Sequence, residues 1–76
     1  MRKTYTVRQG EFNEATSQHP VFTRGTFYSL SDARKFYDQI RADTSWSNSD
    51  YVYTEVIQMS NGSSPLQFDY YLQRVQ

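Results

Sequence analysis

The stretch that decides the fold is residues 29–42, which read SLSDARKFYDQIRA. Its apolar residues recur at positions i, i+3, i+4 and i+7, a spacing that an α-helix places along one face. These residues are Ala33, Phe36, Tyr37 and Ile40. The stretch therefore predicts one amphipathic helix, whose apolar face must be covered by another part of the chain.

Both ends of this stretch carry residues that are typical of helix termini. Ser29 or Ser31 can accept a hydrogen bond from the backbone amides that the first turn leaves unpaired. Asp32 suits the positive end of the helix dipole, and Arg41 suits the negative end. The capping residues and the apolar spacing therefore agree on where the helix lies.

The other side of the predicted helix is charged, with Arg34, Lys35, Asp38 and Arg41. Such a face can contact an acidic partner, but it is more often simply solvated. Arg34 and Asp38 stand four residues apart, so they are expected to form an ordinary ion pair along the helix. We interpret this side as a solvated surface.

Strand-like stretches, rich in β-branched and aromatic residues, lie on both sides of the helix. The predicted strands are residues 3–9, 21–28, 51–59 and 66–75. Gly25 indicates a bulge or a close backbone approach within the second strand, and Asn61-Gly62 predicts a hairpin turn between the last two. Residues 11–19 show neither period and are interpreted as a loop that ends at Pro20.

These elements predict a single α+β domain over residues 1–76, with an antiparallel four-stranded sheet and one helix on one face. A chain this short buries only about 60% of the surface of its unfolded form. It has no cysteine, and its seven Tyr, five Phe and Trp46 outweigh a thin supply of aliphatic residues. We therefore expect an aromatic core, with some Tyr residues left at the surface because their hydroxyls need partners.

Charge and hydropathy argue against two classes of partner. Eight basic and eight acidic residues give a formal net charge of zero, so no global field attracts the chain to nucleic acid or to an anionic membrane. No apolar run approaches the length of a membrane span, and no secretory segment begins the sequence. These observations make the cytoplasm the expected location.

Side chains alternate between the two sides of a strand, so each predicted strand divides into two faces. The helix is expected to cover Tyr5, Val7, Val52, Val56, Phe68, Tyr70 and Leu72. The opposite side is expected to present Arg2, Thr4, Thr6, Arg8, Arg24, Tyr51, Tyr53, Glu55, Ile57, Asp69 and Tyr71. One helix can cover only one side, so this second set should remain uncovered.

An uncovered face rich in tyrosine predicts a surface that binds another protein or a second copy of the chain. Rigid rings and arginine are enriched in interfaces, although Tyr and Thr also suit any sheet surface. The predicted contact residues are Tyr51, Tyr53, Ile57, Tyr71, Arg24 and Trp46. A structural subunit that only associates with itself is a further alternative.

A nucleic-acid-binding module is the other candidate, because cations near tyrosines resemble a stacking platform. The residues concerned are Arg2, Lys3, Arg8 and Arg24. The sequence lacks an RNP-type motif, and Glu55 and Asp69 would repel phosphates from the same face.

No catalytic or metal site is predicted, and no cofactor or small-molecule substrate. His19 is the only histidine and has no nucleophile or orienting carboxylate at a suitable spacing. Residues 43–50 resemble a calcium loop faintly, but they lack the required Gly and distal Glu, so we interpret them as a turn. The sequence does not indicate an enzyme.

A strand, then Ser29-Leu30-Ser31-Asp32-Ala33-Arg34, one amphipathic helix and a long hairpin together resemble many very small proteins carried by phages and mobile elements. Some of these are anti-CRISPR proteins, which act without catalysis by occupying a working surface on a host complex. The resemblance implies an inhibitor or regulator that binds a host protein complex.

Overall fold

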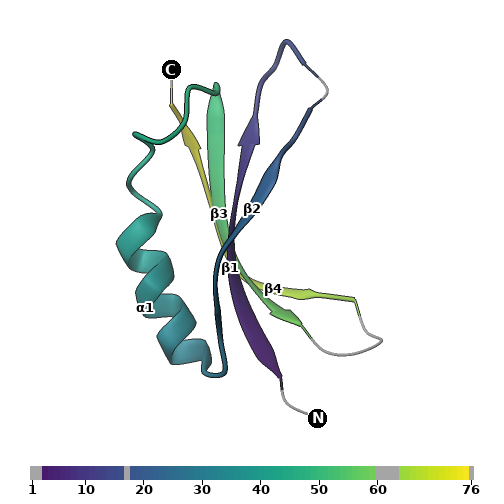
Figure 1. The fold of residues 1–76 in the computed structure, drawn as a ribbon, viewed down its shortest axis with the longest axis vertical. Coiled ribbons are helices and arrows are strands. Elements are labelled where there is room, and N and C mark those ends of the chain that lie inside the picture. The colour runs from purple at the N-terminus through teal and green to yellow at the C-terminus, as the bar shows by residue number, and fades with distance from the viewer. Residues whose placement is uncertain (1–2, 17, 60–63, 76) are drawn as a thin grey trace.

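The computed structural model of the chain describes residues 3–16, 18–59 and 64–75. Its elements are β1 (Thr4–Phe12), β2 (Val21–Phe27), α1 (Leu30–Ile40), β3 (Tyr51–Met59) and β4 (Leu66–Arg74). The four strands form an antiparallel sheet in the order β2-β1-β3-β4, and α1 lies along one side of it (Figure 1). The predicted α+β class and element order are confirmed.

The ends of α1 follow from its capping residues. Ser29 is the N-cap, and its Oγ accepts a hydrogen bond from the backbone amide of Asp32 at 3.3 Å. At the other end, the amide of Arg41 donates to the carbonyl of Tyr37 at 3.0 Å. Of the two serines that the sequence left open, Ser29 is the one that caps the helix.

The ion pair expected along α1 does not form. Arg34 instead reaches across to β4, where its Nε lies 2.9 Å from Oδ2 of Asp69. Asp38 pairs with Arg41, with 3.6 Å between Oδ1 and Nε. The prediction of an Arg34–Asp38 pair is wrong because a carboxylate on the sheet lies within reach of Arg34.

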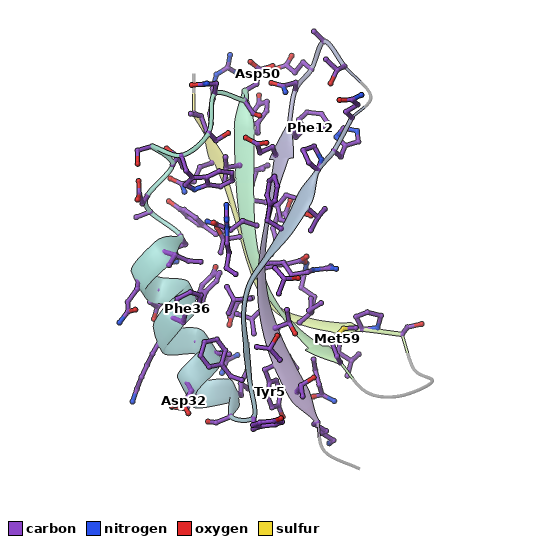
Figure 2. The ribbon with its side chains drawn as sticks, viewed as in Figure 1. Tyr5, Phe12, Asp32, Phe36, Asp50 and Met59 are labelled. Carbon is purple, nitrogen blue, oxygen red and sulfur yellow. The ribbon has the colours of Figure 1, made fainter. Side chains whose placement is uncertain are left out.

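The centre of the core is largely aliphatic, and the aromatic rings lie around it. The buried centre consists of Val7, Ala33, Tyr37 and Val56, with Tyr5, Phe27, Leu30, Phe36 and Ile40 packed against it. Gly25 leaves room for one of these rings, since a Cβ there would lie 3.2 Å from Cε2 of Phe36. Phe36 points from α1 toward the sheet (Figure 2). The expected aromatic core is therefore correct for the border of the core and wrong for most of its centre.

The first strand is longer than the predicted residues 3–9. Glu11 and Phe12 continue β1 because they pair with Val52 and Tyr51 at the start of β3. These partners are distant in the sequence, so the local pattern of residues 11–19 could not reveal the pairing.

A β-bulge in β4 changes the faces that the sequence predicted for this strand. Phe68 is the extra residue between Gln67 and Asp69, which pair with Ile57 and Val56, two consecutive residues of β3. Beyond such a residue the alternation of side chains shifts by one position, so the two faces of the strand exchange.

The contacts of α1 confirm this exchange. Arg34 forms its ion pair with Asp69, and the guanidinium of Arg41 lies 5.1 Å from the ring centroid of Tyr71. Asp69 and Tyr71, which the sequence placed on the uncovered side, therefore lie on the helix side.

The same shift moves Tyr70 and Leu72 away from the helix, contrary to prediction. Leu72 pairs with Tyr53 of β3, and the rings of Tyr53 and Tyr70 stack with centroids 5.4 Å apart. Phe68 keeps its predicted side, where its ring makes an edge contact with Tyr5 at 6.0 Å.

The bulge predicted near Gly25 is confirmed in β2. Arg24 is the extra residue between Thr23 and Gly25, which pair with consecutive residues of β1. The bulge changes the face on which the Arg24 side chain lies. Arg24 is therefore on the helix side, where it bonds to Gln9, rather than on the predicted uncovered side.

The predicted turn at Asn61-Gly62 lies outside the described residues. Among the described residues, α1 is too short and too polar to cross a membrane.

Candidate binding surface on the open face of the sheet

The side of the sheet opposite α1 is called here the open face. The central strands place Thr4, Thr6, Arg8, Gly10 and Phe12 of β1 and Tyr51, Tyr53, Glu55, Ile57 and Met59 of β3 on it. For β1 and β3 this agrees with the predicted faces. From β4, the bulge adds Tyr70 and Leu72.

One end of the open face contains a hollow of about 620 Å³ with a largely aromatic lining. The hollow is defined by its lining residues, which are Glu11, Phe12, Glu14, His19, Tyr51, Tyr53, Tyr70 and Leu72. It lies at the end of the sheet where Phe12 and Asp50 are found, far from Tyr5 and Met59 at the other end (Figure 2).

The floor of the hollow depends on a glycine. Gly10 pairs with Tyr53, whose ring lies directly over it: a Cβ at Gly10 would be only 2.1 Å from Cε2 of that ring. A ring that covers a cross-strand glycine fills the space of the missing side chain. The ring of Tyr53 also stacks on Tyr70 with an interplanar angle of 22°. Tyr53 is thus held between β1 and β4.

Burial beside these rings changes the acidity of Tyr53. Desolvation and the nearby Glu55 carboxylate raise the pKa of its hydroxyl, and Arg8 lowers it by a smaller amount. At neutral pH the floor of the hollow therefore presents an uncharged hydroxyl.

One wall of the hollow is formed by Phe12 and Tyr51, whose ring centroids lie 5.8 Å apart. The imidazole of His19 stacks on Phe12, with centroids 4.9 Å apart and planes 7° from parallel. Arg74 donates from Nη1 to the hydroxyl of Tyr51 at 3.1 Å. His19 therefore acts as part of an aromatic wall in this structure.

Beyond the hollow, an ion pair occupies the middle of the open face. Arg8 Nη2 lies 2.7 Å from Oε2 of Glu55, and Gln67 donates from Nε2 to the other oxygen at 2.9 Å. The side chain of Glu55 is only 7% exposed, against 34% for Arg8. The carboxylate is thus satisfied by three nitrogen donors from its neighbours, among them Nε of Arg8 at 2.9 Å.

The structure separates the six predicted contact residues into four groups. Tyr51 and Tyr53 meet in the hollow. Ile57 is on the same face but only 3% exposed, so it offers little surface to a partner. Tyr71 lies on the helix side beside Arg41. Arg24 and Trp46 form a separate cluster on that side.

Trp46 folds back over β2 rather than extending into solvent. Its Nε1 donates to the carbonyl of Asp43 at 3.0 Å, and the guanidinium of Arg24 lies 4.6 Å from its ring centroid. Arg24 in turn donates from Nε to Oε1 of the buried Gln9 at 2.9 Å. These side chains line a smaller cavity of about 310 Å³ between α1 and β2.

The loop before β3 is a turn, as the sequence predicted. Asp43 accepts hydrogen bonds from the hydroxyl and the amide of Ser45, at 2.6 and 3.0 Å. These two bonds hold the pKa of the Asp43 carboxyl below its ordinary value. Across residues 3–16, 18–59 and 64–75, no cluster of three His, Cys, Asp or Glu side chains could hold a metal ion.

The cations proposed for nucleic-acid binding do not gather into one platform. Arg8 lies on the open face but is paired with Glu55. Arg24 stacks on Trp46 on the opposite side of the sheet. Arg2 lies outside the described residues, and Lys3 precedes β1.

Sequence reasoning missed Phe12, Tyr70 and Leu72, which border the hollow. Phe12 was assigned to a loop, and the other two were assigned to the wrong face of β4. A signal existed for Gly10 and Tyr53, because a strand glycine favours an aromatic residue on the next strand. Using that signal requires the register between β1 and β3, which the sequence does not display.

No protein-family model, curated protein or solved structure matches the chain. Inference about function therefore depends on the geometry and chemistry of the open face.

Proposed function

We propose that this chain is a non-catalytic protein-binding module that receives its partner in the hollow on the open face. The observation that carries this proposal is the set of apolar side chains left exposed there. Phe12 is 39% exposed, Tyr70 49% and Leu72 52%. Contiguous exposed apolar groups on a small domain are typical of interaction sites.

The arrangement favours a macromolecular partner over a small ligand. Phe12 and Leu72 stand on opposite borders of the hollow, on β1 and β4. A partner that covers both borders gains contact area outside the hollow as well as inside it, which a small ligand cannot do. Rigid Tyr and Phe rings supply such area at a low cost in conformational entropy.

The charges on the open face favour protein over nucleic acid. Glu55 compensates Arg8 next to the hollow, and Glu14 lies in its lining. Phosphate binding needs uncompensated cations, which this end of the face supplies poorly. An inhibitor or regulator that covers a working surface of a host complex is one form that such a module takes.

The proposal is tested by affinity capture with matched variants as bait. The double variant Phe12→Ala, Tyr51→Ala removes one wall of the hollow and leaves the helix side unchanged. Tyr28→Ala is the control, because Tyr28 is 68% exposed and does not line the hollow. Circular dichroism and cooperative unfolding establish that each bait is folded.

We expect a protein that the wild type and Tyr28→Ala capture equally and that the double variant loses. The same protein should protect Phe12 and Tyr51 from solvent in footprinting with the purified pair. Equal capture by all three baits would show that the partner binds elsewhere and would reject the hollow as the contact surface.

A further inference from the structure

The two edge strands of the sheet, β2 and β4, differ in how well they can pair with a further strand. β2 has seven residues and contains the bulged Arg24 followed by Gly25, features that disfavour pairing at an edge. β4 has nine residues, and its bulge lies in its first half. Beyond the bulge, residues 70–73 are uncharged and continue regularly alongside β3 (Figure 1).

The ladder between β3 and β4 determines which backbone groups of β4 point outward. The amide of Val75 donates to the carbonyl of Asp50 at 2.7 Å, so these two residues form a hydrogen-bonded pair. Such pairs alternate along an antiparallel ladder. The next hydrogen-bonded pairs along β4 are therefore at Gln73 and Tyr71, whose backbone N–H and C=O groups point toward β3. The N–H and C=O groups of Tyr70 and Leu72 therefore point away from β3, toward the open edge of the sheet.

We propose that β4 pairs in antiparallel fashion with β4 of a second copy of this chain, with Leu72 near the twofold axis. Tyr70 and Leu72 are two residues apart, which is the repeat of hydrogen-bonded pairs in an antiparallel ladder. Pairing around Leu72 therefore aligns the outward donors and acceptors of one copy with those of the other. This inference does not require a partner in the hollow, although the side chains of Tyr70 and Leu72 also line it.

The charges on β4 agree with self-pairing. Asp69 lies at one end of the regular segment and Arg74 at the other. An antiparallel arrangement centred on Leu72 keeps the two Asp69 side chains apart and the two Arg74 side chains apart. Asp69 and Arg74 lie on opposite faces of the sheet, so the pairing avoids like-charge contacts without forming a new ion pair. Asp69 also has its own ion pair with Arg34. No pair of uncompensated like charges therefore faces across the twofold axis.

A second copy also suits β4 because apolar side chains leave this strand on both sides of the sheet. Tyr71 is 40% exposed on the helix side, and Leu72 is 52% exposed on the open face. A strand added in the plane of the sheet contacts both sets, whereas a partner lying on one face contacts only one. Pairing two β4 strands about a twofold axis closes the assembly, which pairing β4 with β2 would not do.

The test measures mass and amide exchange across concentration. Sedimentation equilibrium from about 1 µM to about 1 mM should show the mass rising toward that of a dimer. Over the same range, exchange of the Tyr70 and Leu72 amides should slow by roughly ten-fold or more, because pairing protects outward N–H groups. A monomer throughout this range overturns the proposal.

Variants at the two edges provide matched controls. Leu72→Pro removes an outward N–H from β4 without removing a bond to β3, and should weaken the dimer by roughly ten-fold or more. Val21→Pro does the same at the outer edge of β2 and should leave the dimer unchanged. Leu72→Lys, which places like charges near the twofold axis, is the second variant in case Leu72→Pro does not fold.

The hollow variant separates this inference from the proposed function. Phe12→Ala, Tyr51→Ala should retain the dimer, since neither residue belongs to β4. A dimer lost in this double variant would place self-association on the hollow and overturn the edge assignment, whatever the Leu72 variants do, because Leu72 also borders the hollow.

Discussion

The two faces of the sheet bury their central residues by different means. On the helix side, Val7 and Val56 are fully buried because α1 supplies a second layer that includes Ala33. On the open face, Ile57 and Glu55 are also nearly buried, although no helix or strand in the described part of the chain covers them. The side chains of Arg8 and Gln67, from the strands on either side of β3, contact Glu55. A sheet this twisted and narrow can hide the residues of its inner strands while leaving those of its edges available.

Removing volume on the helix side should have the largest effect on stability. Val56→Ala leaves a cavity between α1 and the sheet that the fixed backbone cannot fill, so we expect a loss of about 2–3 kcal/mol. Val21→Ala is the matched change at an exposed position and should cost about 0.5 kcal/mol or less. Urea unfolding with comparison of both midpoints measures the difference. Similar losses for the two variants would contradict the two-layer account of the core.

Adding a side chain beneath the ring of Tyr53 should have the next largest effect on stability. Gly10→Ala would force the ring off the floor of the hollow, at a cost of about 2 kcal/mol. The cost should fall in a Tyr53→Ala background, where the obstructing ring is absent. A double-mutant cycle on unfolding free energies measures this coupling. Additive effects of the two changes would mean that the ring does not pack on Gly10.

Breaking the ion pair between Arg8 and Glu55 on the open face should reduce stability more than breaking the pair between Arg34 of α1 and Asp69. Glu55→Gln leaves Arg8 without its buried carboxylate and should cost about 1–2 kcal/mol. Asp69→Asn breaks the more exposed pair with Arg34 and should cost less than about 1 kcal/mol. Unfolding at low and high salt distinguishes the two, because only the exposed pair should be strongly screened. A stronger salt effect on Glu55 would show that its carboxylate is hydrated.

The smallest expected effect is a dependence of stability on alkaline pH. Folding raises the pKa of Tyr53 above its ordinary value of 10.0, so the folded state favours the neutral hydroxyl. That contribution is fully present below pH 10 and is lost as the pH rises through the folded-state pKa. Burial also raises the pKa of Tyr37. Between pH 9 and about 11, the Tyr53→Phe variant should therefore lose less stability than the wild type. The double variant, Tyr37→Phe with Tyr53→Phe, should lose less stability than the single variant.

Guanidine unfolding at each pH measures this dependence. Parallel losses in the wild type and both variants would mean that the two hydroxyls ionise equally easily in the folded and unfolded states.

Much of the fold could be predicted from local patterns. The apolar spacing of residues 29–42 and the cap at Ser29 locate the helix, and alternation assigns β1 and β3 to their correct faces. The predictions that were wrong depend on pairing between distant residues. Phe12 belongs to a strand only because Tyr51 lies beside it, and Tyr70 changes face only because Phe68 is bulged. Neither pairing has a signal in the neighbouring sequence.

The candidate site could be predicted only in part for the same reason. Tyr51 and Tyr53 follow from alternation on a strand without a bulge. Arg24 was misplaced because a bulge near Gly25 can be expected, but which neighbour it turns cannot. Trp46 was grouped with the open face, although its loop returns to β2, a contact that no periodicity describes.

The order of the strands also has a consequence for how the chain reaches its folded state. Each half of the sequence forms one hairpin, and the two inner strands, β1 and β3, join the halves. Gln9 and Thr54, which meet there through a side-chain hydrogen bond, are 45 positions apart. Contacts of such long range slow folding, since a large loop must close before they form. The rate-limiting event should therefore be the pairing of β1 with β3, which closes a loop that contains β2 and α1.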